Sequence, residues 1–181
     1  MLRGELVGLR ARRPADVPIL HAELYDDVEI RSRSDSRPWR PIPVESAASP
    51  FAVDATLGDA APFSVVTLSD DALVGSALLW GIDSYNRMAH LGVSLFPAAR
   101  GSGYGADVVA VLCHYGFVVR GLHRLQVDTL ADNAAMIAAA ENSGFVIEGT
   151  LRSTAWVTGR FLDEVILGLL ADDWNPRHPA S

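Results

Sequence analysis

Hydrophobic and polar residues alternate along the first half of the chain in the way expected of half-buried β-strands. The alternation begins in Glu5–Arg12, which we predict to be a strand at the edge of a sheet. It returns in Pro62–Leu68, Ala72–Ile82 and Met88–Leu95, which are separated by short polar segments. Such connections are typical of hairpins, so the pattern predicts an antiparallel meander for these three strands.

Helical and irregular patterns precede the meander. Pro14–Leu24 carries a proline and an acidic residue in its first turn, and both are favourable at a helix N-terminus. Asp26–Pro50 is rich in Arg, Ser, Pro and Asp, and its prolines exclude a central strand, so we expect short helices and loops there. Segments of this kind often carry substrate contacts.

The second half of the chain alternates between helices and strands. The pattern predicts a helix over Gly103–Val119, a strand over Arg124–Thr129, an alanine-rich helix over Asn133–Asn142, and a final strand pair over Phe145–Val157 and Phe161–Leu170. Gly144 follows the second of these helices at the position of a left-handed C-cap. The whole order predicts the α+β class, with a mixed, mostly antiparallel sheet of six or seven strands and helices on both faces.

Length and composition are consistent with this fold. A chain of 181 residues fits a single domain, here 1–181, with a sizeable core. The one cysteine, Cys113, excludes an intramolecular disulfide, and we expect it to be a buried packing residue because its helix is almost wholly apolar. No Cys/His cluster indicates a metal site, and no apolar stretch indicates a membrane span. A reducing, cytoplasmic location is therefore expected.

The charge of the chain narrows its expected partners. The net charge is −7, and the basic residues are scattered rather than clustered. A nucleic-acid partner is therefore not expected, and cationic amines are the more natural partners. All 15 basic residues are arginines, so the α-amino group of residue 1 is the one aliphatic amine in the sequence.

The segment most informative about chemistry is a glycine-rich turn, Arg100–Gly105, which reads R-G-S-G-Y-G between a strand and a helix. Glycines let the backbone approach an anion closely, and the N–H groups of a helix N-terminus attract negative charge, so the turn is a candidate phosphate site. Steric requirements alone also produce such turns. The glycine spacing excludes a Rossmann fingerprint, and the absence of lysine excludes a Walker A site.

The same six residues match every fixed position of the pyrophosphate-binding signature Q/R-x-x-G-x-G/A, and the chain resembles the GNAT superfamily of acyl-CoA N-acyltransferases. Later motifs follow the order seen in the branch that acetylates the N-termini of ribosomal proteins: Leu122–Leu125, Asn133, Glu141–Phe145, Glu148-Gly149, Leu151-Arg152, Gly159–Asp163 and Leu169–Trp174. The resemblance covers about residues 5–174. It implies the GNAT fold and the use of acetyl-CoA, or coenzyme A, as a co-substrate.

The resemblance also implies roles for individual residues. The main chain of Val93 and Leu95 is expected to pair with the pantetheine arm of coenzyme A. The amides of the turn are expected to hold the pyrophosphate. Asn133 is expected either to reach the pantetheine or its thiol end, or simply to cap the helix that it begins. The candidate cofactor-binding residues are thus Val93, Leu95, Arg100, Gly101, Ser102, Gly103, Tyr104, Gly105 and Asn133.

The candidate catalytic residue is His90. Family members commonly place a glutamate two residues before the glycine that here is Gly92, and this chain has His90 at that position. A histidine titrates near neutrality and can take a proton from the attacking ammonium through water, although a surface or core histidine is the alternative. Relatives protonate the leaving thiolate with a tyrosine or a serine, but these positions are Ala140 and Met136. The thiolate is therefore expected to leave without a protein acid.

The resemblance and the acidic chain together predict transfer of an acetyl group from acetyl-CoA to a primary amine. The expected acceptor is the α-amino group of a peptide or protein, because its pKa of about 8, against about 10.4 for lysine, makes a weak base sufficient. Three alternatives stay open: another donor such as succinyl-CoA, a small-molecule amine as acceptor, and a CoA-binding module without turnover. Whether the chain forms a homodimer also stays open.

Overall fold

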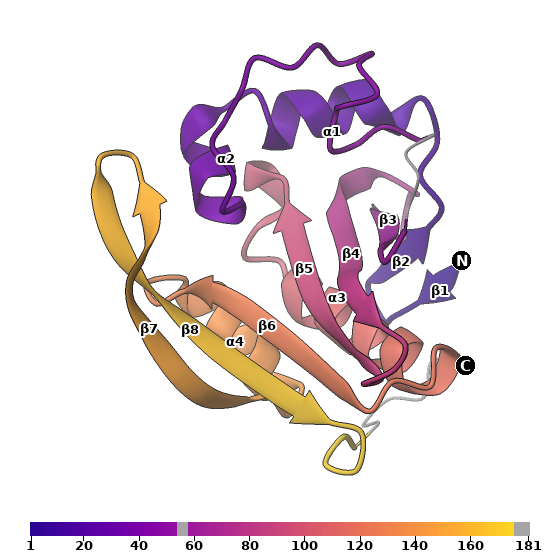
Figure 1. Cartoon of the computed structure of the whole chain (residues 1–181). Coiled ribbons are helices and arrows are strands. Elements are labelled where there is room, and N and C mark those ends of the chain that lie inside the picture. The colour runs from indigo at the N-terminus through magenta and orange to yellow at the C-terminus, as the bar shows by residue number, and fades with distance from the viewer. Residues whose placement is uncertain (54–57, 176–181) are drawn as a thin grey trace.

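The described part of the chain, residues 1–53 and 58–175 of a computed structural model, contains one eight-stranded sheet (Figure 1). Its strands are β1 Leu2–Arg3, β2 Val7–Arg10, β3 Ala61–Thr67, β4 Leu73–Asp83, β5 Met88–Leu95, β6 Arg124–Leu130, β7 Val146–Val157 and β8 Arg160–Leu170. They lie in the order β1-β2-β3-β4-β5-β6-β8-β7. All neighbouring strands are antiparallel except β5 and β6, which are parallel. The α+β class and the mixed, mostly antiparallel sheet are therefore confirmed.

The structure corrects two details of the sheet. The sheet of the described residues has eight strands instead of six or seven, and Glu5–Arg12 does not supply its edge strand. β2 pairs with β3 on one side and with β1 on the other, so β1 is the edge. A strand of two residues is too short to show an alternation of hydrophobic and polar positions, so the sequence pattern does not indicate it. The predicted antiparallel meander of β3, β4 and β5 is confirmed.

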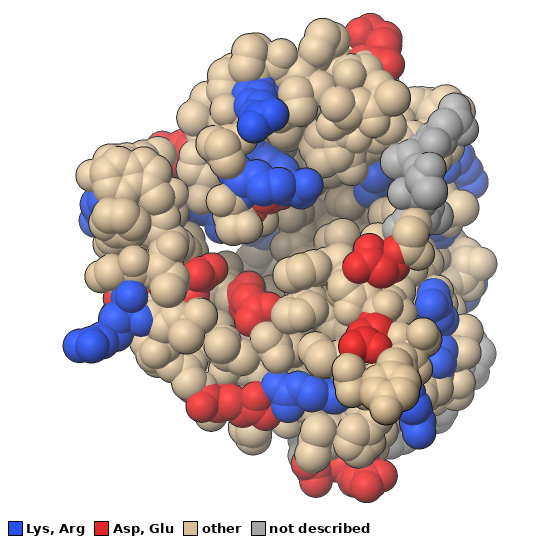
Figure 2. Space-filling view, viewed as in Figure 1, with Lys and Arg blue, Asp and Glu red and all other residues tan. Residues whose placement is uncertain are grey.

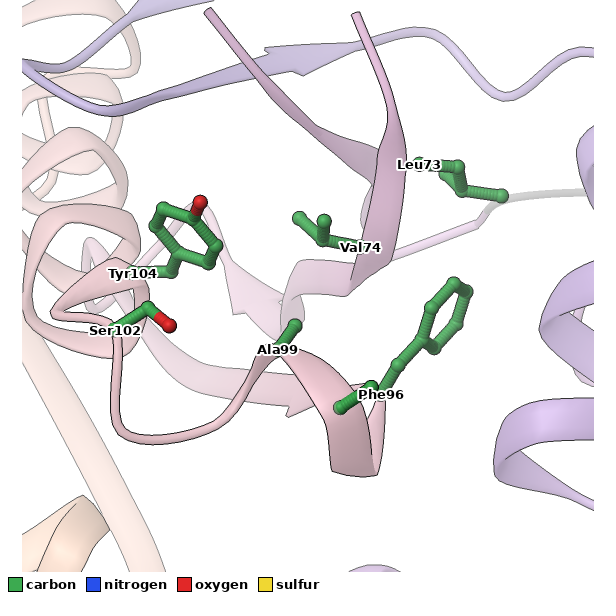
Figure 3. Close-up of a pocket in the computed structure, with 7 residues that line it drawn as sticks. Leu73, Val74, Phe96, Ala99, Ser102 and Tyr104 are labelled. Carbon is green, nitrogen blue, oxygen red and sulfur yellow. The ribbon is translucent and has the colours of Figure 1, made fainter. Parts of the chain in front are cut away.

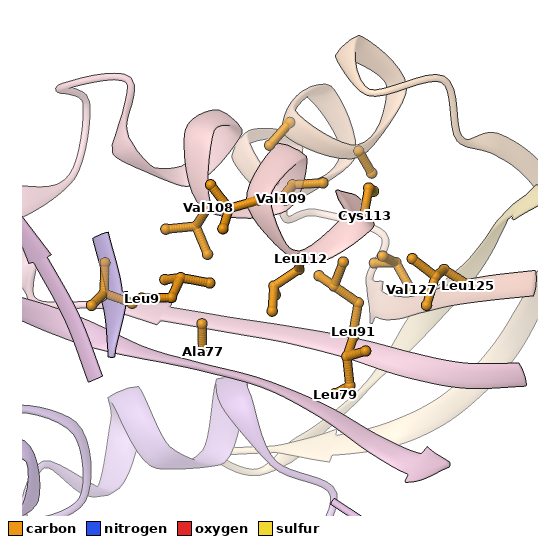
Figure 4. Packing of buried hydrophobic residues seen from close by; sticks show 14 of the residues in the cluster. Leu9, Ala77, Leu79, Leu91, Val108, Val109, Leu112, Cys113, Leu125 and Val127 are labelled. Carbon is orange, nitrogen blue, oxygen red and sulfur yellow. The ribbon is translucent and has the colours of Figure 1, made fainter. Parts of the chain in front are cut away.

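Helices cover both faces of the sheet, as predicted. The α-helices of the described residues are α1 Asp16–Leu24, α2 Val28–Ser34, α3 Tyr104–His114 and α4 Ala134–Asn142. A 3-10 turn, η1 Pro97–Ala99, precedes α3, and a π-helical turn, η2 Tyr115–Val119, follows it. Figures 1 and 4 show α3 and α4 on one face and the N-terminal helices on the other. In residues 1–53 and 58–175, no helix has the length and apolar character needed to cross a membrane.

Two glycines at helix ends adopt conformations that favour glycine. Gly103, the N-cap of α3, has a φ of +81°, and Gly144, just beyond α4, has a φ of +98°. Both lie in the left-handed region, which glycine enters without the steric cost that a side chain would bring. The left-handed conformation predicted for Gly144 is therefore confirmed.

The hydrophobic core lies between the sheet and α3 (Figure 4). Leu79 on β4, Leu112 on α3 and Leu125 on β6 are fully buried there. Each such leucine contributes roughly 1.5–3 kcal/mol to the free energy of unfolding. Cys113, the neighbour of Leu112, is also fully buried, and burial raises the pKa of its thiol. The prediction that Cys113 is a packing residue is confirmed.

A buried carboxylate, that of Asp16, fastens α1 to the sheet. It accepts two hydrogen bonds from Arg10 on β2, at 2.6 and 2.9 Å, and one from the Ser64 hydroxyl on β3, at 2.7 Å. The backbone N–H of Arg13 donates a fourth, at 2.8 Å. Burial alone raises the pKa of this carboxyl, but the hydrogen bonds and the charge of Arg10 outweigh it and lower the pKa to about 2. The ionised group therefore links α1 to β2 and β3.

A second carboxylate, that of Asp107, fastens the N-terminal turn of α3 to the start of the chain. It accepts hydrogen bonds from the backbone N–H groups of Glu5, Leu6 and Val7, at 3.0, 2.8 and 2.9 Å. Gly4 lies against the carboxylate, and a Cβ at that position would stand 2.6 Å from Asp107 Cγ. Because α3 begins directly after the glycine-rich turn, these bonds also hold the turn in place beside β2.

Candidate active site

Strands β5 and β6 separate in the middle of the sheet (Figure 1). Their parallel pairing joins Met88–His90 to Arg124–Gln126 and extends no further. β5 continues to Leu95 with β4 as its partner on the other side. Residues 91–95 therefore have no paired strand on the β6 side among the described residues, over a length of roughly 17 Å at about 3.4 Å per residue. Val93 and Leu95, the predicted pantetheine-binding residues, both lie on this open edge.

The glycine-rich turn closes one end of this opening. Arg100 donates from Nε to the carbonyl of Leu95, the last residue of β5, at 3.3 Å. Gly101 and Gly103 have φ values of +78° and +81°, so two of the three glycines occupy left-handed conformations. The turn leads into the first turn of α3, where backbone N–H groups lack carbonyl partners within the helix. The local geometry is that of an anion site at a helix N-terminus.

The side chains of Ser102 and Tyr104 line a groove of about 270 Å³ beside the turn (Figure 3). Its other lining residues are apolar and come from the start of β4 and from η1 and its flank: Leu73, Val74, Phe96, Ala98 and Ala99. Because β4 and β6 lie on opposite edges of β5, this groove is separate from the opening between β5 and β6.

The structure places Asn133 as the N-cap of α4. Its side-chain carbonyl accepts a hydrogen bond from the N–H of Met136 at 3.3 Å, and its side-chain N–H donates to Thr129 Oγ1 at 3.0 Å. Both polar atoms of the side chain are thus engaged in fixing the start of the helix. Ala140, at the position of the missing tyrosine, is fully buried. Neither it nor Met136 carries a proton donor, as the sequence indicates.

The imidazole of His90 lies where the pairing of β5 and β6 stops. Its Nδ1 is 2.5 Å from Asp128 Oδ2 on β6. Its ring stacks on the indole of Trp80, with centroids 4.1 Å apart and planes at 21°. The side chain is 21% exposed, so it is neither a core residue nor a free surface residue. The predicted catalytic residue is therefore held in one orientation at the end of the opening opposite the glycine-rich turn.

His90 is bonded to a row of polar side chains on β6 that was not predicted from the sequence. Gln126 donates from Nε2 to Asp128 Oδ1 at 2.8 Å, and Arg124 donates to Gln126 Oε1 at 3.2 Å. Burial raises the pKa of the Asp128 carboxyl, but the hydrogen bonds from His90 and Gln126 outweigh this effect, so the pKa lies below its ordinary value. The sequence contains a signal for this row, because its polar residues alternate with Leu125 and Val127, which are buried, on one strand.

Acidic side chains are prominent on the face that carries His90. Residues paired across neighbouring strands share a face, and the registers place Asp128 and Glu164 on that of His90. Glu148 lies there too, since it is ion-paired with Arg124 of the polar row. Figure 2 shows this side of the molecule hollowed between the N-terminal helices and the sheet, with arginines above the hollow and acidic side chains below it. An acidic lower side favours the approach of a cation.

The sequence of this chain is similar to those of known acetyltransferases. A family model described as an acetyltransferase (GNAT) domain matches residues 7–146. An uncharacterized N-acetyltransferase of Bacillus licheniformis, p20, is 25% identical over 171 residues, which cover 94% of this chain and 96% of that protein. A putative ribosomal N-acetyltransferase of Bacillus subtilis, YdaF, is 30% identical over 108 residues, which cover 60% of this chain and 59% of that protein.

A solved structure shares the fold. It is that of spermidine N-acetyltransferase from Vibrio cholerae in complex with CoA and spermine, with a TM-score of 0.82 at 22% sequence identity. The similarity covers 92% of this chain and 96% of that one.

Proposed function

The chain belongs to the acetyltransferase (GNAT) family and is an acetyl-CoA-dependent N-acetyltransferase, and from this premise we propose that it acetylates a primary amine by direct attack in a ternary complex. The observation that carries the proposal is the opening between β5 and β6, which has the glycine-rich turn at one end and His90 at the other. A thioester lying in this opening and an amine on the face of His90 meet at one point. Direct transfer needs only that meeting and a proton acceptor.

Coenzyme A, in this proposal, lies along the open edge of β5. The pantetheine arm carries two amide groups, which hydrogen-bond to the main chain of Val93 and Leu95 much as a further strand would. The pyrophosphate is held by the amides of Gly101–Gly105, helped by the dipole of α3. Asn133 contributes by fixing the start of α4 beside the opening.

The reaction then requires His90 to remove one proton. The acceptor arrives as an ammonium ion, and Nε2 of neutral His90 takes a proton from it, which leaves a free amine. The amine nitrogen attacks the thioester carbonyl carbon, the C–S bond breaks, and sulfur keeps the electron pair. The nitrogen loses a second proton, which solvent carries to the thiolate, and protonated His90 returns its proton to solvent. The products are the acetamide, the CoA thiol and one proton, so the charge balances.

We propose the α-amino group of a peptide or protein as the acceptor. Its pKa of about 8 means that a noticeable fraction is already unprotonated at neutral pH, so a base of the strength of a histidine suffices. The relative YdaF, whose name is putative ribosomal N-acetyltransferase, supports this class of acceptor. The hollow between the N-terminal helices and the sheet leaves access for a chain end (Figure 2).

A polyamine is the second candidate acceptor. Asp128 and Glu164 share the face of His90 and favour a positively charged acceptor, while the charge of Glu148 on the same face is balanced by Arg124. The similarity to a spermidine N-acetyltransferase crystallised with spermine supports the same class.

A competition assay tests the proposal. Acetyl-CoA is offered with equal concentrations of peptides with free N-termini, polyamines and aminoglycosides, and the acetylated products are counted by mass spectrometry. The matched control for each peptide has its N-terminus blocked and carries an internal lysine, so that it offers a side-chain amine but no free α-amino group. We expect products on free N-termini and none on the blocked peptides.

Each other result has a defined meaning. Preferential acetylation of a polyamine replaces the first acceptor by the second. Preferential acetylation of an aminoglycoside contradicts both acceptors. Thiol release from acetyl-CoA without transfer to any amine contradicts the proposed reaction.

A further inference from the structure

The imidazole of His90 is oriented from two neighbouring strands. On β4, the Trp80 indole covers one face of the ring, at 4.1 Å between centroids. On β6, the Asp128 carboxylate lies 2.5 Å from Nδ1. The stack sets the plane of the ring, and the carboxylate sets which nitrogen points toward β6. Within residues 1–53 and 58–175 the ring makes its one hydrogen bond through Nδ1, and Nε2 makes none.

The carboxylate also determines which nitrogen carries the proton. Asp128 is ionised at neutral pH, since its pKa lies below the ordinary value for an aspartate. An ionised carboxylate only accepts hydrogen bonds, so Nδ1 of the neutral ring must carry the N–H. Nε2 is then left with its lone pair and is the nitrogen able to receive a proton.

Gly81 keeps the Nε2 edge of the ring uncovered. Its φ is +58°, and a Cβ at this position would stand 3.3 Å from His90 Cδ2 and 4.0 Å from Nε2. A larger side chain would lie against the same edge. Glycine is therefore favoured at position 81 for two reasons: the backbone is left-handed there, and a side chain would crowd the edge of the ring that carries Nε2.

Asp128 is held in turn by the polar row on β6. Gln126 donates to its second oxygen, and Arg124 bonds to Gln126 and to both carboxylate oxygens of Glu148 on β7, at 2.8 and 2.5 Å. β8 lies between β6 and β7, and its Gly168 is opposite Gln126. A Cβ at Gly168 would stand 2.6 Å from Glu148 Cδ and 2.7 Å from Arg124 Nη1. Because Gly168 has no side chain, the ion pair between Arg124 and Glu148 can cross β8 at this position.

From this geometry we infer that Asp128 is a positioning residue for acetyl transfer, which holds His90 in the tautomer whose Nε2 takes the proton from the acceptor. The inference rests on the proposed function, because it requires His90 to be the base. In this step one N–H bond of the ammonium breaks and one N–H bond forms at Nε2. The resulting imidazolium keeps its Nδ1–H bonded to Asp128, whose negative charge stabilises the cation. The other charged groups of the row are Arg124 and Glu148, while β4 contributes the uncharged Trp80.

The tautomer is measured directly by ¹⁵N NMR of the imidazole nitrogens, with the His90 signals identified by their loss in His90→Ala. In the neutral ring we expect the proton on Nδ1. In Asp128→Asn the side-chain amide can donate to Nδ1, so the proton is expected to move to Nε2. A wild-type ring protonated on Nε2 would overturn the inference at any level of activity.

Kinetics give an independent readout. Asp128→Asn should lower kcat by about 10²-fold with an unchanged Kd for coenzyme A, because Nε2 no longer has a lone pair for the proton. Asp128→Glu, which restores a carboxylate, should recover part of the rate.

Asp71→Asn is the matched control. It makes the same change of charge in the exposed turn between β3 and β4, at a φ of +57° that asparagine tolerates, and should keep the wild-type rate. A loss of less than about threefold in Asp128→Asn overturns the inference and leaves the proposed function standing if His90→Ala is inactive. Near-normal activity of His90→Ala overturns both.

Gly168→Ala tests the polar row without changing His90 or Asp128. The three atoms nearest to the added methyl group belong to the flexible ends of Glu148 and Arg124, which can move aside, so the fold is expected to survive. If the Asp128 carboxylate shifts as a result, kcat should fall roughly tenfold, with the affinity for coenzyme A unchanged. An unchanged kcat would overturn the part of the inference that assigns the support of Asp128 to this row.

Discussion

Replacing Gly103 with valine is expected to abolish the binding of coenzyme A and to leave the fold intact. Gly103 has φ +81° and ψ −9°, a left-handed conformation that a β-branched residue adopts with difficulty. Holding valine there costs roughly 1–2 kcal/mol of the free energy of unfolding. The new Cβ would stand 3.4 Å from Leu6 Cδ1, and Leu6 is 45% exposed, so its side chain can move aside. The loss of stability should therefore stay close to the conformational cost.

The loss of binding should be larger than the loss of stability. Valine either fills the space in which the pyrophosphate approaches the turn or forces the backbone out of the left-handed region and turns the amides away. A hydrogen bond to a charged group contributes about 1.5–3 kcal/mol. Losing two of them weakens binding by about 3–6 kcal/mol, which is a decrease in affinity of roughly 10²- to 10⁴-fold.

Calorimetric titration with coenzyme A measures this loss, and circular dichroism with thermal unfolding checks the fold. The control is Gly159→Val, in the turn between β7 and β8, where φ is +93° and a Cβ would have no atom within 4 Å. This control should show a similar loss of stability and normal affinity for coenzyme A. Near-native affinity in folded Gly103→Val would refute the assignment of the pyrophosphate to this turn.

Three further predictions concern the base, the pH dependence of stability and the reactivity of the chain. His90→Ala should lower kcat/KM by about 10²-fold or more with unchanged affinity for coenzyme A, and a loss below about threefold would leave His90 with a structural role only. Asp16 should stabilise the protein above pH 4 by about 2.5 kcal/mol, because folding lowers its pKa from 3.8 to about 2, and this contribution should disappear as the pH falls through 2. Urea unfolding of the wild type and Asp16→Asn at several pH values measures it, and a difference that does not shrink in acid would contradict it. Prolonged incubation with acetyl-CoA should add at most one acetyl group to the intact mass, because the chain has no lysine and Cys113 is buried with a raised thiol pKa, so two stable adducts would disprove the argument.

Long patterns made most of the sheet predictable from the sequence. β5, Met88–Leu95, has the predicted bounds, because its alternation runs over eight residues, a polar segment precedes it and Pro97 follows shortly after it. The two-residue β1 could not be predicted, since its position depends on pairing with β2 and not on a pattern of its own. The glycine-rich turn was predictable for a physical reason, since left-handed conformations at Gly101 and Gly103 favour glycine.

The surroundings of His90 were much less predictable. Asp128 lies 38 positions further along the chain, and it meets His90 only because β5 and β6 pair in one parallel register. No local pattern specifies that register. The roles of Gly81 and Gly168 are equally invisible in the sequence, because each depends on which side chain of another residue approaches it. For Asn133 the sequence left two roles open, and the structure shows the capping contacts.

A crystal structure with coenzyme A bound is the most direct test of the proposed site. We expect the pantetheine arm between β5 and β6, hydrogen-bonded to the main chain of Val93 and Leu95, with the pyrophosphate on the amides of Gly101–Gly105. The thiol should lie on the side of His90 that presents Nε2. Coenzyme A bound away from this opening, for example in the groove lined by Leu73 and Phe96, would contradict the account.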